Sequence, residues 1–379
     1  MKIYIDENIP YGKSFFKGFG EVVQFSGRDV TAEQVKDADV LLVRSITKVD
    51  QSLLALNKKI KFVGTATIGI DHIDIEYLKQ KNIQFNSAPG CNKVSVAEYV
   101  LSALLVLAEK KQFQLTNKTV AIVGAGNTGT AVYQCLTAIG VTCKLYDPPL
   151  NAVGDQREFC DFSEVLSADI ISLHVPKIIT GPFKTLHMFD EHVLNQLTDK
   201  QILINACRGE VIDNQALLKT VKKENCPTLV LDVWEKEPNI EKLLLPYIAL
   251  ATPHIAGYSL DGKVRGTEML YQALCKYLNM TPMLNSTDFM AKPNISEITI
   301  TSSFTLELLK PLVHLIYDVR RDDALFRIKV NESNGFDNMR KNYQERRELS
   351  TLMLNMTTSE VNHLSTTDLS QVGFTVNNI

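Results

Sequence analysis

The chain has 379 residues, of which 45% are hydrophobic, and its formal net charge is −3. This length exceeds what one compact core supports, so we expect two or three domains with well-formed cores. The small net charge gives no sign of a nucleic-acid or membrane partner. No apolar run is long enough to span a bilayer. An anionic ligand would therefore have to meet a local group of positive charges.

The seven cysteines are widely spaced and form no CxxC pair. This pattern fits neither a disulfide framework nor a zinc site, so we predict reduced thiols, a cytoplasmic location and no bound metal. The first residues read as a strand and not as a secretory signal.

Short apolar strands alternate with helical stretches in the first hundred residues. Segments 40–43 and 60–63 are predicted to be buried parallel strands. Residues 95–110 contain neither Gly nor Pro and are rich in Leu, Val and Ala. They predict a long helix that links two domains.

A second alternating pattern runs from Thr119 to about Pro253. Its predicted strands are 120–123, 143–146, 170–173, 202–204 and 229–231. Strands separated by helical segments indicate βαβ units and a parallel sheet with right-handed crossovers. Residues 262–278 are predicted to form a helix that returns to the first domain.

The pattern changes after Thr281-Pro282. We predict a strand at 297–301 and a helix at 306–319 that Pro311 interrupts or kinks. The charged residues of 320–323 and 340–348 nearly balance in sign. A solvated face accounts for them, and a subunit interface is the alternative.

The segment Gly124–Gly129, with glycines at its first, third and sixth positions, follows a predicted strand and opens a helix. Gly124 permits a tight turn, Gly126 lets the backbone approach a pyrophosphate, and Gly129 allows close packing of helix and strand. The phosphates would bind to free N–H groups at the helix N-terminus. Alone the pattern is weak, because glycine turns also pack without a ligand.

Asp147 strengthens this interpretation, because it ends the next strand, 18 residues after Gly129. A carboxylate there can accept hydrogen bonds from both ribose hydroxyls and repels a 2′-phosphate. Pro148 and Pro149 supply no compensating cation. The sequence therefore predicts NAD rather than NADP.

Three later segments follow strands of the same predicted domain and carry candidate catalytic groups. Arg208 can grip a carboxylate through two parallel hydrogen bonds. His254 has the basicity to take a hydroxyl proton near neutral pH, and a carboxylate such as Glu237 can fix its tautomer. Each residue has a plain structural interpretation, as a surface ion pair, a core histidine or a solvated acid. Their arrangement after successive strands favours catalysis.

These three segments resemble motifs of the D-isomer-specific 2-hydroxyacid dehydrogenases. The motifs are Asn-x-x-Arg-Gly at 205–209, Asp-Val-x-Glu-x-Glu-Pro at 232–238 and Pro-His-x-x-Gly at 253–257. The resemblance implies that Arg208 holds the substrate carboxylate and that Glu237 pairs with His254. It covers roughly residues 1–280.

The resemblance implies a flavodoxin-like α/β substrate domain at 1–95 plus 258–280 and a Rossmann-like, doubly wound NAD-binding domain at 96–257. The expected cofactor contacts, besides the three glycines and Asp147, are Asn127, Thr128, Val175, Ala206, Cys207, Arg208, Asp232 and Gly257. Val175 departs from the family, where a hydroxyl-bearing residue often touches the cofactor.

Within the family, the chain most resembles the branch that oxidises 4-phospho-D-erythronate on a route to pyridoxal 5′-phosphate. The supporting segments are 6–10, 64–72, 88–92 and the tail with 317–323 and 340–347. This narrower resemblance, which includes the tail, also implies a small α+β dimerisation domain at 281–379, and hence a homodimer. Similarity implies that Ser45, Thr67 and Tyr258 contact this phosphorylated 2-hydroxy acid. Arg44 and Lys48 are candidate charge partners of the phosphate on chemical grounds alone. Ser and Thr at strand ends also commonly cap helices.

Two alternatives stay open at this stage. One is another 2-hydroxyacid oxidoreductase, such as a phosphoglycerate dehydrogenase, because the Val-Arg-Ser-x-Thr segment at 43–47 also occurs there. The other is an NAD-sensing binding protein that resembles the transcriptional corepressors built on this fold.

Overall fold

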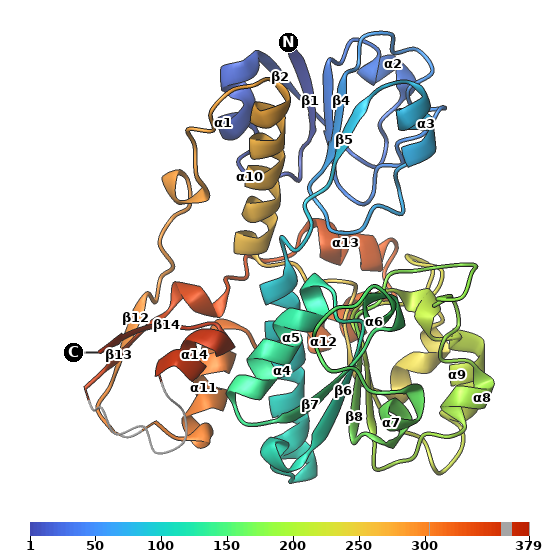
Figure 1. Ribbon diagram of the computed structural model, residues 1–379, viewed down its shortest axis with the longest axis vertical. Coiled ribbons are helices and arrows are strands. Elements are labelled where there is room, and N and C mark those ends of the chain that lie inside the picture. Colours follow the sequence, from blue (N-terminus) through green and yellow to red (C-terminus); the bar gives the residue numbers. More distant parts are fainter. Residues whose placement is uncertain (303, 358–365, 379) are drawn as a thin grey trace. The chain divides into compact units, whose positions relative to one another are not determined.

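The computed structural model describes residues 1–302, 304–357 and 366–378, and the chain divides into two compact units (Figure 1). The first unit comprises Met1–Asn92 and Ser259–Lys292. The second comprises Lys93–Tyr258 and Pro293–Ile379. The first unit contains one parallel sheet and the second unit two, and each unit has its own apolar clusters.

A five-stranded parallel sheet forms the centre of the first unit, in the order β2-β1-β3-β4-β5. This is the flavodoxin-like order, as predicted. Its strands are β1 (Lys2–Asp6), β2 (Glu21–Phe25), β3 (Val40–Val43), β4 (Phe62–Thr65) and β5 (Gln84–Asn86). Its helices are α1 (Gly12–Phe16), α2 (Ala32–Val35), α3 (Ile75–Gln80) and α10 (Leu260–Tyr277), with short turns η1 (Lys17–Phe19) and η5 (Ser286–Asp288). Strand β3 is buried on both faces because all four of its residues are apolar.

Strand β4 begins at Phe62, later than the predicted 60–63. The cause is Asn57, whose Oδ1 accepts hydrogen bonds from the backbone N–H groups of Lys59 and Ile60, each at 2.8 Å. These bonds hold the chain in a turn where the apolar pattern alone predicted an extended strand.

Helix α10 belongs to the first unit although it follows the second unit's large sheet in the chain. The Oγ of Ser259 caps it by accepting a hydrogen bond from the N–H of Gly262 at 2.8 Å. The ring of Tyr271 lies 5.4 Å from that of Phe15 in α1, and Leu270 and Leu274 are fully buried. This apolar face explains why the segment packs on the first sheet.

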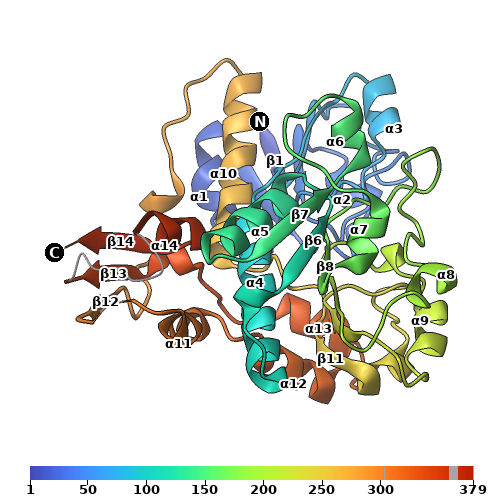
Figure 2. The same ribbon diagram turned by 60° about the horizontal axis from the view of Figure 1, so that its bottom comes forward.

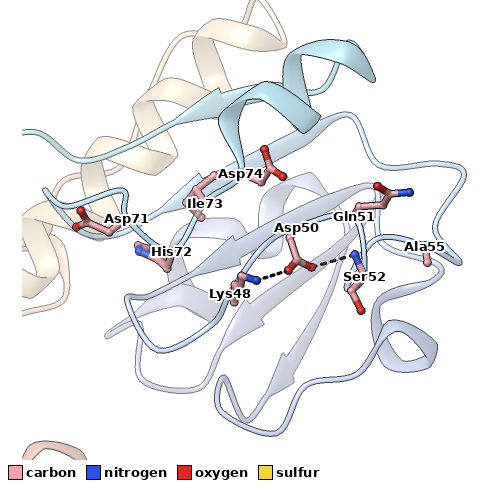
Figure 3. A pocket seen from close by; sticks show the side chains of 9 residues that line it. All are labelled: Lys48, Asp50, Gln51, Ser52, Ala55, Asp71, His72, Ile73 and Asp74. Atoms are coloured by element: carbon pink, nitrogen blue, oxygen red, sulfur yellow. Dashed lines mark hydrogen bonds and ion pairs between the residues drawn. The ribbon is translucent and has the colours of Figure 1, made fainter. Parts of the chain in front are cut away.

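The loops after β3 and β4 surround an open hollow of about 650 Å³ (Figure 3). Its lining residues are Lys48, Asp50, Gln51, Ser52, Ala55, Asp71, His72, Ile73 and Asp74. The Nζ of Lys48 lies 2.8 Å from Asp50 Oδ2, and Asp50 Oδ1 accepts a hydrogen bond from the N–H of Ser52. His72 Nε2 lies 2.9 Å from the hydroxyl of Thr65 at the end of β4.

The second unit contains a six-stranded parallel sheet in the order β11-β10-β9-β8-β6-β7. Its strands are β6 (Thr119–Val123), β7 (Thr142–Tyr146), β8 (Ile170–Leu173), β9 (Ile202–Asn205), β10 (Thr228–Leu231) and β11 (Ile248–Ala251). Phe159 forms a parallel bridge with Leu145 of β7, so its segment takes the place of a further strand at the outer edge of the sheet, next to β7. Counted from β6, the order becomes 3-2-1-4-5-6-7, which contains the Rossmann order. The predicted fold class is confirmed.

The helix predicted at 95–110 is α4 (Lys93–Lys111), which lies along α5 in both views (Figures 1 and 2). Between α4 and residue 259, the second unit also contains α5 (Asn127–Ala138), α6 (Pro148–Ala152), α7 (Phe162–Ser167), α8 (Glu191–Leu194) and α9 (Asn214–Thr220). Short turns η2 (Leu115–Asn117), η3 (Gly209–Val211) and η4 (Lys242–Tyr247) join them. None of the described helices is both long and apolar enough to cross a membrane.

The C-terminal residues of the second unit add a parallel sheet in the order β12-β13-β14. Their elements are β12 (Glu297–Ile300), α11 (Leu306–Ile316), α12 (Val319–Lys329), α13 (Gly335–Lys341), η6 (Leu349–Thr351), β13 (Met353–Met356), α14 (Thr366–Val372) and β14 (Thr375–Asn378). Helices α11 and α12 pack on α4, α12 also packs on β11, and α14 packs on α5. The C-terminal region thus contacts the six-stranded sheet and its helices directly.

Helix α11 ends at Ile316, before the predicted 319, and Pro311 lies inside it without ending it. The backbone of Tyr317 is extended, because Ser102 of α4 binds there instead of a further helical turn. The Ser102 hydroxyl donates to Tyr317 O and accepts from the N–H of Val319, both at 3.1 Å. A partner distant in sequence therefore fixes this helix end.

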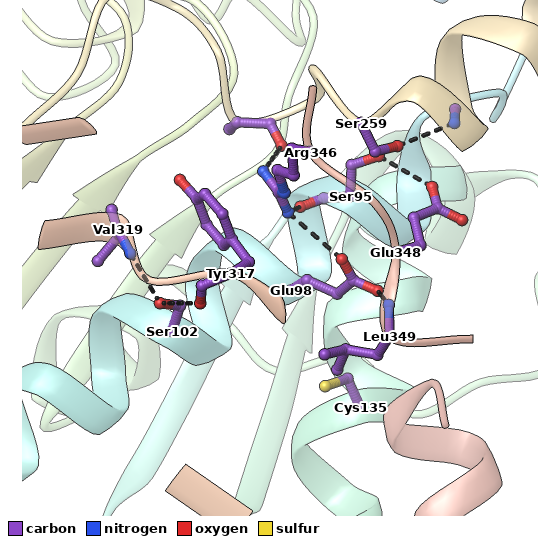
Figure 4. Close-up of polar contacts among 12 residues, drawn as sticks. Ser95, Glu98, Ser102, Cys135, Ser259, Tyr317, Val319, Arg346, Glu348 and Leu349 are labelled. Carbon is purple, nitrogen blue, oxygen red and sulfur yellow. Dashed lines mark hydrogen bonds and ion pairs between the residues drawn. The ribbon is translucent and has the colours of Figure 1, made fainter. Parts of the chain in front are cut away.

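A buried polar cluster joins the C-terminal region to α4 (Figure 4). The guanidinium of Arg346 donates to Ser95 O at 2.6 Å and lies 3.4 Å from Glu98 Oε2. It also lies 3.4 Å from the ring centroid of Tyr317. The other Glu98 oxygen accepts the N–H of Leu349 at 2.7 Å. Burial raises the pKa of Glu98 from 4.5 to about 8, although Arg346 opposes this shift.

This pKa predicts that Glu98 makes stability depend on pH. Folded Glu98 keeps its proton where the unfolded chain has lost it, so its stabilising contribution falls as the pH rises from about 4.5 to about 8. Glu98→Gln cannot ionise, so its stability relative to the wild type should rise over this range by up to about 1.4 kcal/mol per pH unit. Urea unfolding followed by the fluorescence of Trp234, the single tryptophan, measures this difference. Exposed Glu345→Gln is the control, and an unchanged slope in Glu98→Gln would contradict the prediction.

Candidate active site

The three glycines of the turn between β6 and α5 meet three different steric demands. Gly124 has φ +94°, and a Cβ on it would lie 2.6 Å from His174 O. A Cβ on Gly129 would lie 1.8 Å from Gly124 O, so helix and turn approach only without one. Gly126 faces open space: among the described residues, none beyond its chain neighbours has an atom within 4 Å of where a Cβ would lie. The protein itself does not require glycine there, but a ligand approaching the backbone would.

Asp147 lies next to this turn at the end of β7. Its Oδ2 accepts the N–H of Ala125 at 2.8 Å, and its Oδ1 accepts the N–H of Leu150 at 3.0 Å. These bonds fix the carboxylate beside the glycine turn while leaving it partly exposed. The position suits a contact with the ribose of a dinucleotide.

Arg157 also reaches the glycine turn, which the sequence did not reveal. Its Nη1 donates to Ala125 O at 2.9 Å and to the Thr130 hydroxyl at 2.8 Å. Its other nitrogens bind Asp155 at 2.9 and 2.8 Å. Although Pro148 and Pro149 supply no cation, the guanidinium of Arg157 is therefore present near the turn. The carboxylate of Asp155 balances its charge.

The other expected cofactor contacts of the second unit lie in this turn or after neighbouring strands. Asn127 and Thr128 form the first turn of α5, Ala206 and Cys207 follow β9, and Gly257 follows β11. Val175 follows β8, and a Cβ on Gly124 would lie 2.9 Å from its Cγ1. The carboxyl ends of these parallel strands share one edge of the sheet, where such folds bind nucleotides.

Arg208 follows β9, and the side chain of Asn205 organises its loop. Asn205 Nδ2 donates to Arg208 O at 3.0 Å, and Asn205 Oδ1 accepts the N–H of Cys207 at 3.2 Å. Arg208 is half-buried, and its Nη1 donates to Cys207 O at 2.7 Å. A Cβ on Gly209 would lie 2.0 Å from Trp234 O, so this loop touches the backbone that leads to Glu237.

Glu237 and His254 are in direct contact: Glu237 Oε2 lies 2.7 Å from His254 Nδ1. The other oxygen of Glu237 accepts the N–H of Trp234 at 2.9 Å. Burial alone would raise the pKa of Glu237, but the charge and hydrogen bond of His254, with the charge of Arg340, bring it below its usual value. Glu237 is therefore an ionised partner that orients the imidazole.

Asp232 fixes the loop that carries His254. The residue is 1% exposed, and its carboxylate accepts hydrogen bonds from the Thr252 hydroxyl at 2.7 Å and from the N–H groups of Ile255 and Ala256 at 2.8 and 2.9 Å. Its backbone oxygen accepts the N–H of His254 at 2.6 Å. These bonds hold His254 at φ +59°, in the left-handed region that non-glycine residues rarely adopt. The structure thus gives Asp232, an expected cofactor contact, a role in shaping the loop.

The first glutamate of the 232–238 segment has different partners. Glu235 Oε1 lies 2.6 Å from His187 Nε2, and Glu235 Oε2 accepts the N–H of Asn214 at 2.9 Å. His187, Asp213 and Glu235 are near enough together to hold a metal ion. Both oxygens of Glu235 have partners within the protein. The sequence-based prediction of no bound metal stays a prediction.

The candidate phosphate contacts belong to the first unit. Ser45 follows β3 and is exposed, and Thr67 follows β4 and is half-buried, so both lie at one edge of that sheet. The Thr67 hydroxyl lies 2.7 Å from that of Thr65 and donates to Gly69 O at 2.8 Å. Internal bonds therefore orient this side chain.

The two candidate cations differ in their surroundings. Arg44 is half-buried, and its Nη1 donates to Asn8 O at 3.1 Å. The side chain of Lys48 is 79% exposed and pairs with Asp50 at the hollow of Figure 3. Such exposed pairs are weak, so Lys48 keeps its freedom to exchange partners. Arg44 is the more firmly positioned of the two.

Comparison with known proteins identifies the class first. The family model for the D-isomer specific 2-hydroxyacid dehydrogenase NAD binding domain matches residues 105–256. D-lactate dehydrogenase from Aquifex aeolicus, solved with NAD and lactic acid, has a TM-score of 0.59 and 24% identity, over 73% of this chain and 95% of its own. NAD⁺-bound 3-phosphoglycerate dehydrogenase from Entamoeba histolytica has a TM-score of 0.62 and 24% identity, over 76% and 99%. The class is an NAD-dependent 2-hydroxyacid oxidoreductase.

More similar relatives narrow this class. Erythronate-4-phosphate dehydrogenase of Psychromonas ingrahamii is 62% identical over 100% of this chain and 97% of its own length. The enzyme of the same name from Colwellia psychrerythraea is 51% identical over 96% and 98%. The chain belongs to the erythronate-4-phosphate dehydrogenases, a family within the D-isomer-specific 2-hydroxyacid dehydrogenases. The predicted family, enzyme class and cofactor are confirmed. Residues 289–373 also match a domain of unknown function, DUF3410.

The glycine turn allows a test that separates cofactor binding from folding. Gly126→Ala places a methyl group in open space, so the protein should fold normally while NAD affinity falls at least about tenfold. Gly129→Ala would clash inside the turn and should lower the melting temperature instead. NAD titration with thermal melts measures both effects. Unchanged NAD affinity in a folded Gly126→Ala variant would argue against this binding mode.

Proposed function

We propose that the protein oxidises 4-phospho-D-erythronate to (R)-3-hydroxy-2-oxo-4-phosphooxybutanoate, a step in pyridoxal 5′-phosphate biosynthesis. The observation that carries the chemistry is the 2.7 Å contact between Glu237 and His254. The full-length relatives named erythronate-4-phosphate dehydrogenase support the substrate.

The mechanism assigns one task to each side chain. Glu237 holds His254 Nδ1, which leaves Nε2 to accept the proton of the C2 hydroxyl. Arg208 binds the substrate carboxylate through its planar guanidinium and polarises the developing carbonyl. NAD held at the glycine turn and Asp147 would supply the acceptor for the hydride that leaves C2. The positive charge on His254 that follows proton transfer is balanced by Glu237.

The fit of the dinucleotide rests on this chain's own residues. Gly126 leaves space at the N-terminus of α5, whose free N–H groups suit the pyrophosphate. Asp147 suits the ribose, and Asn127, Thr128, Val175, Ala206, Cys207 and Gly257 are proposed as further contacts. Asp232 is proposed to act through the loop that it holds. The residues proposed to contact the substrate are Ser45, Thr67 and Tyr258, together with Arg44 and Lys48.

We also propose a cytoplasmic homodimer formed through residues 281–379. None of the seven cysteines, all within the described residues, forms a disulfide, which suits a reducing compartment. Exposed apolar side chains in α11 and α12, Leu315, Leu325 and Ile328, support a contact surface in this region. The remaining domain assignments follow the two units: a substrate domain around the first sheet and a cofactor domain around the second.

The substrate assignment is tested by comparing 4-phospho-D-erythronate with 3-phosphoglycerate. We expect NADH formation with the first and a kcat/KM at least about a hundredfold lower with the second, because the polar groups of the site would be left unpaired. NADH absorbance is read both as a burst in the first turnover and in the steady state. The two readings detect the reaction whether the cofactor leaves after each turnover or stays bound. A preference for 3-phosphoglycerate would replace the proposed substrate, and NAD binding without any turnover would favour a sensor.

The proton acceptor is tested by His254→Ala. Loss of general-base catalysis should lower kcat by roughly 10²–10⁴ while the NAD dissociation constant stays near that of the wild type. Exposed His192 in α8 supplies the matched control, His192→Ala, which should retain full activity. Substantial turnover by His254→Ala across the pH range would remove His254 from the mechanism.

A further inference from the structure

Helix α13 and the segment after it lie within residues 289–373, the part of the chain that matches the domain DUF3410. Arg340 is in the last turn of α13, and its Nε donates to the hydroxyl of Tyr258 at 3.2 Å. Its guanidinium carbon lies 5.7 Å from the ring centroid of Tyr258 and 5.9 Å from that of Phe336. Two aromatic rings and a hydrogen bond therefore fix this cation.

Arg340 also acts on the acid–base pair through its charge. It is one of the groups that lower the pKa of Glu237, after His254 itself. Tyr258 and Glu237 in turn hold Arg340 in its charged form. The C-terminal region thus supplies a positive charge that acts on Glu237, the proposed partner of His254.

A second arginine of the same region binds the same loop. Arg346 is 4% exposed, and its Nη1 donates to Ala256 O at 3.1 Å. The N–H of Ala256 is bound by Asp232 from the other direction. The loop from His254 to Tyr258 is therefore held at 256 by Arg346 and at 258 by Arg340.

We propose that Arg340 is a positioning residue of the active site, which fixes Tyr258 and keeps a positive charge facing the Glu237–His254 pair. Residues 289–373 then complete the site within the same chain. This inference rests on the proposed function, because it assigns Arg340 to the same acid–base pair.

The charge of Arg340 has a definite consequence for the pH profile. Within the described part of the chain, the buried Asp232 also interacts with His254 through its charge, and Tyr258 and Asp337 interact in the same way with Arg340. A cation next to the pair disfavours an added proton. Without it, the pair keeps its proton to a higher pH, so the acid limb of kcat/KM should move upward.

The experiment compares Arg340→Gln, Arg340→Lys and Tyr258→Phe with the wild type. Arg340→Gln should move the acid limb of kcat/KM up by about one pH unit and raise KM. Arg340→Lys keeps the charge but not the planar fork, so it should restore the limb while KM stays raised. Tyr258→Phe removes the hydroxyl that accepts the hydrogen bond of Arg340. It should raise KM and leave the acid limb of kcat/KM nearly unchanged.

The control is Arg320→Gln in the same region, which removes an exposed arginine paired with Asp318 and should leave both kcat and KM unchanged. Melting temperature and Trp234 fluorescence report the fold of each variant. An acid limb at the wild-type pH in Arg340→Gln overturns the proposal, whether or not the variant is less stable. Full turnover by His254→Ala would instead overturn the proposed function, so the two failures are distinguishable.

Discussion

The buried carboxylate of Asp232 is the constraint on which the second unit's functional edge depends. It sits at the end of β10 and binds the side chain or backbone of three residues that follow β11. These bonds hold His254 in a left-handed conformation that its own backbone disfavours. The buried hydrogen bonds of Asp232 offset the backbone strain of this conformation. The imidazole is thereby fixed where Glu237 can meet it.

Much of this arrangement was predictable because it follows from local patterns. Parallel sheets bury strands on both faces, so runs such as Val40–Val43 and Ile170–Leu173 are visible as uninterrupted apolar segments. The carboxyl ends of neighbouring strands meet at one edge, so motifs that follow β9, β10 and β11 were expected to converge. The contact of Glu237 with His254 agrees with that logic, while the catalytic roles of both residues stay proposals.

The features that sequence did not predict depend on partners far along the chain. Arg157 reaches the glycine turn from outside any motif, and nothing near it in the sequence indicates this. Arg340 and Arg346 lie in a charged stretch that reads as a solvated face, yet both bind the loop after β11. The early end of α11 is likewise set by Ser102, more than two hundred residues away. Local periodicity carries no information about such long-range hydrogen bonds.

The absence of a side chain at Gly209 has a consequence for redesign of this enzyme. Its α-carbon lies so near the backbone of Trp234 that the loop holding the guanidinium and the loop holding the acid are in contact. A displacement of one loop is therefore transmitted to the other. Substitutions in one loop should combine non-additively with substitutions in the other. If the proposed roles of the two loops hold, attempts to redesign substrate binding and proton transfer have to treat both loops together.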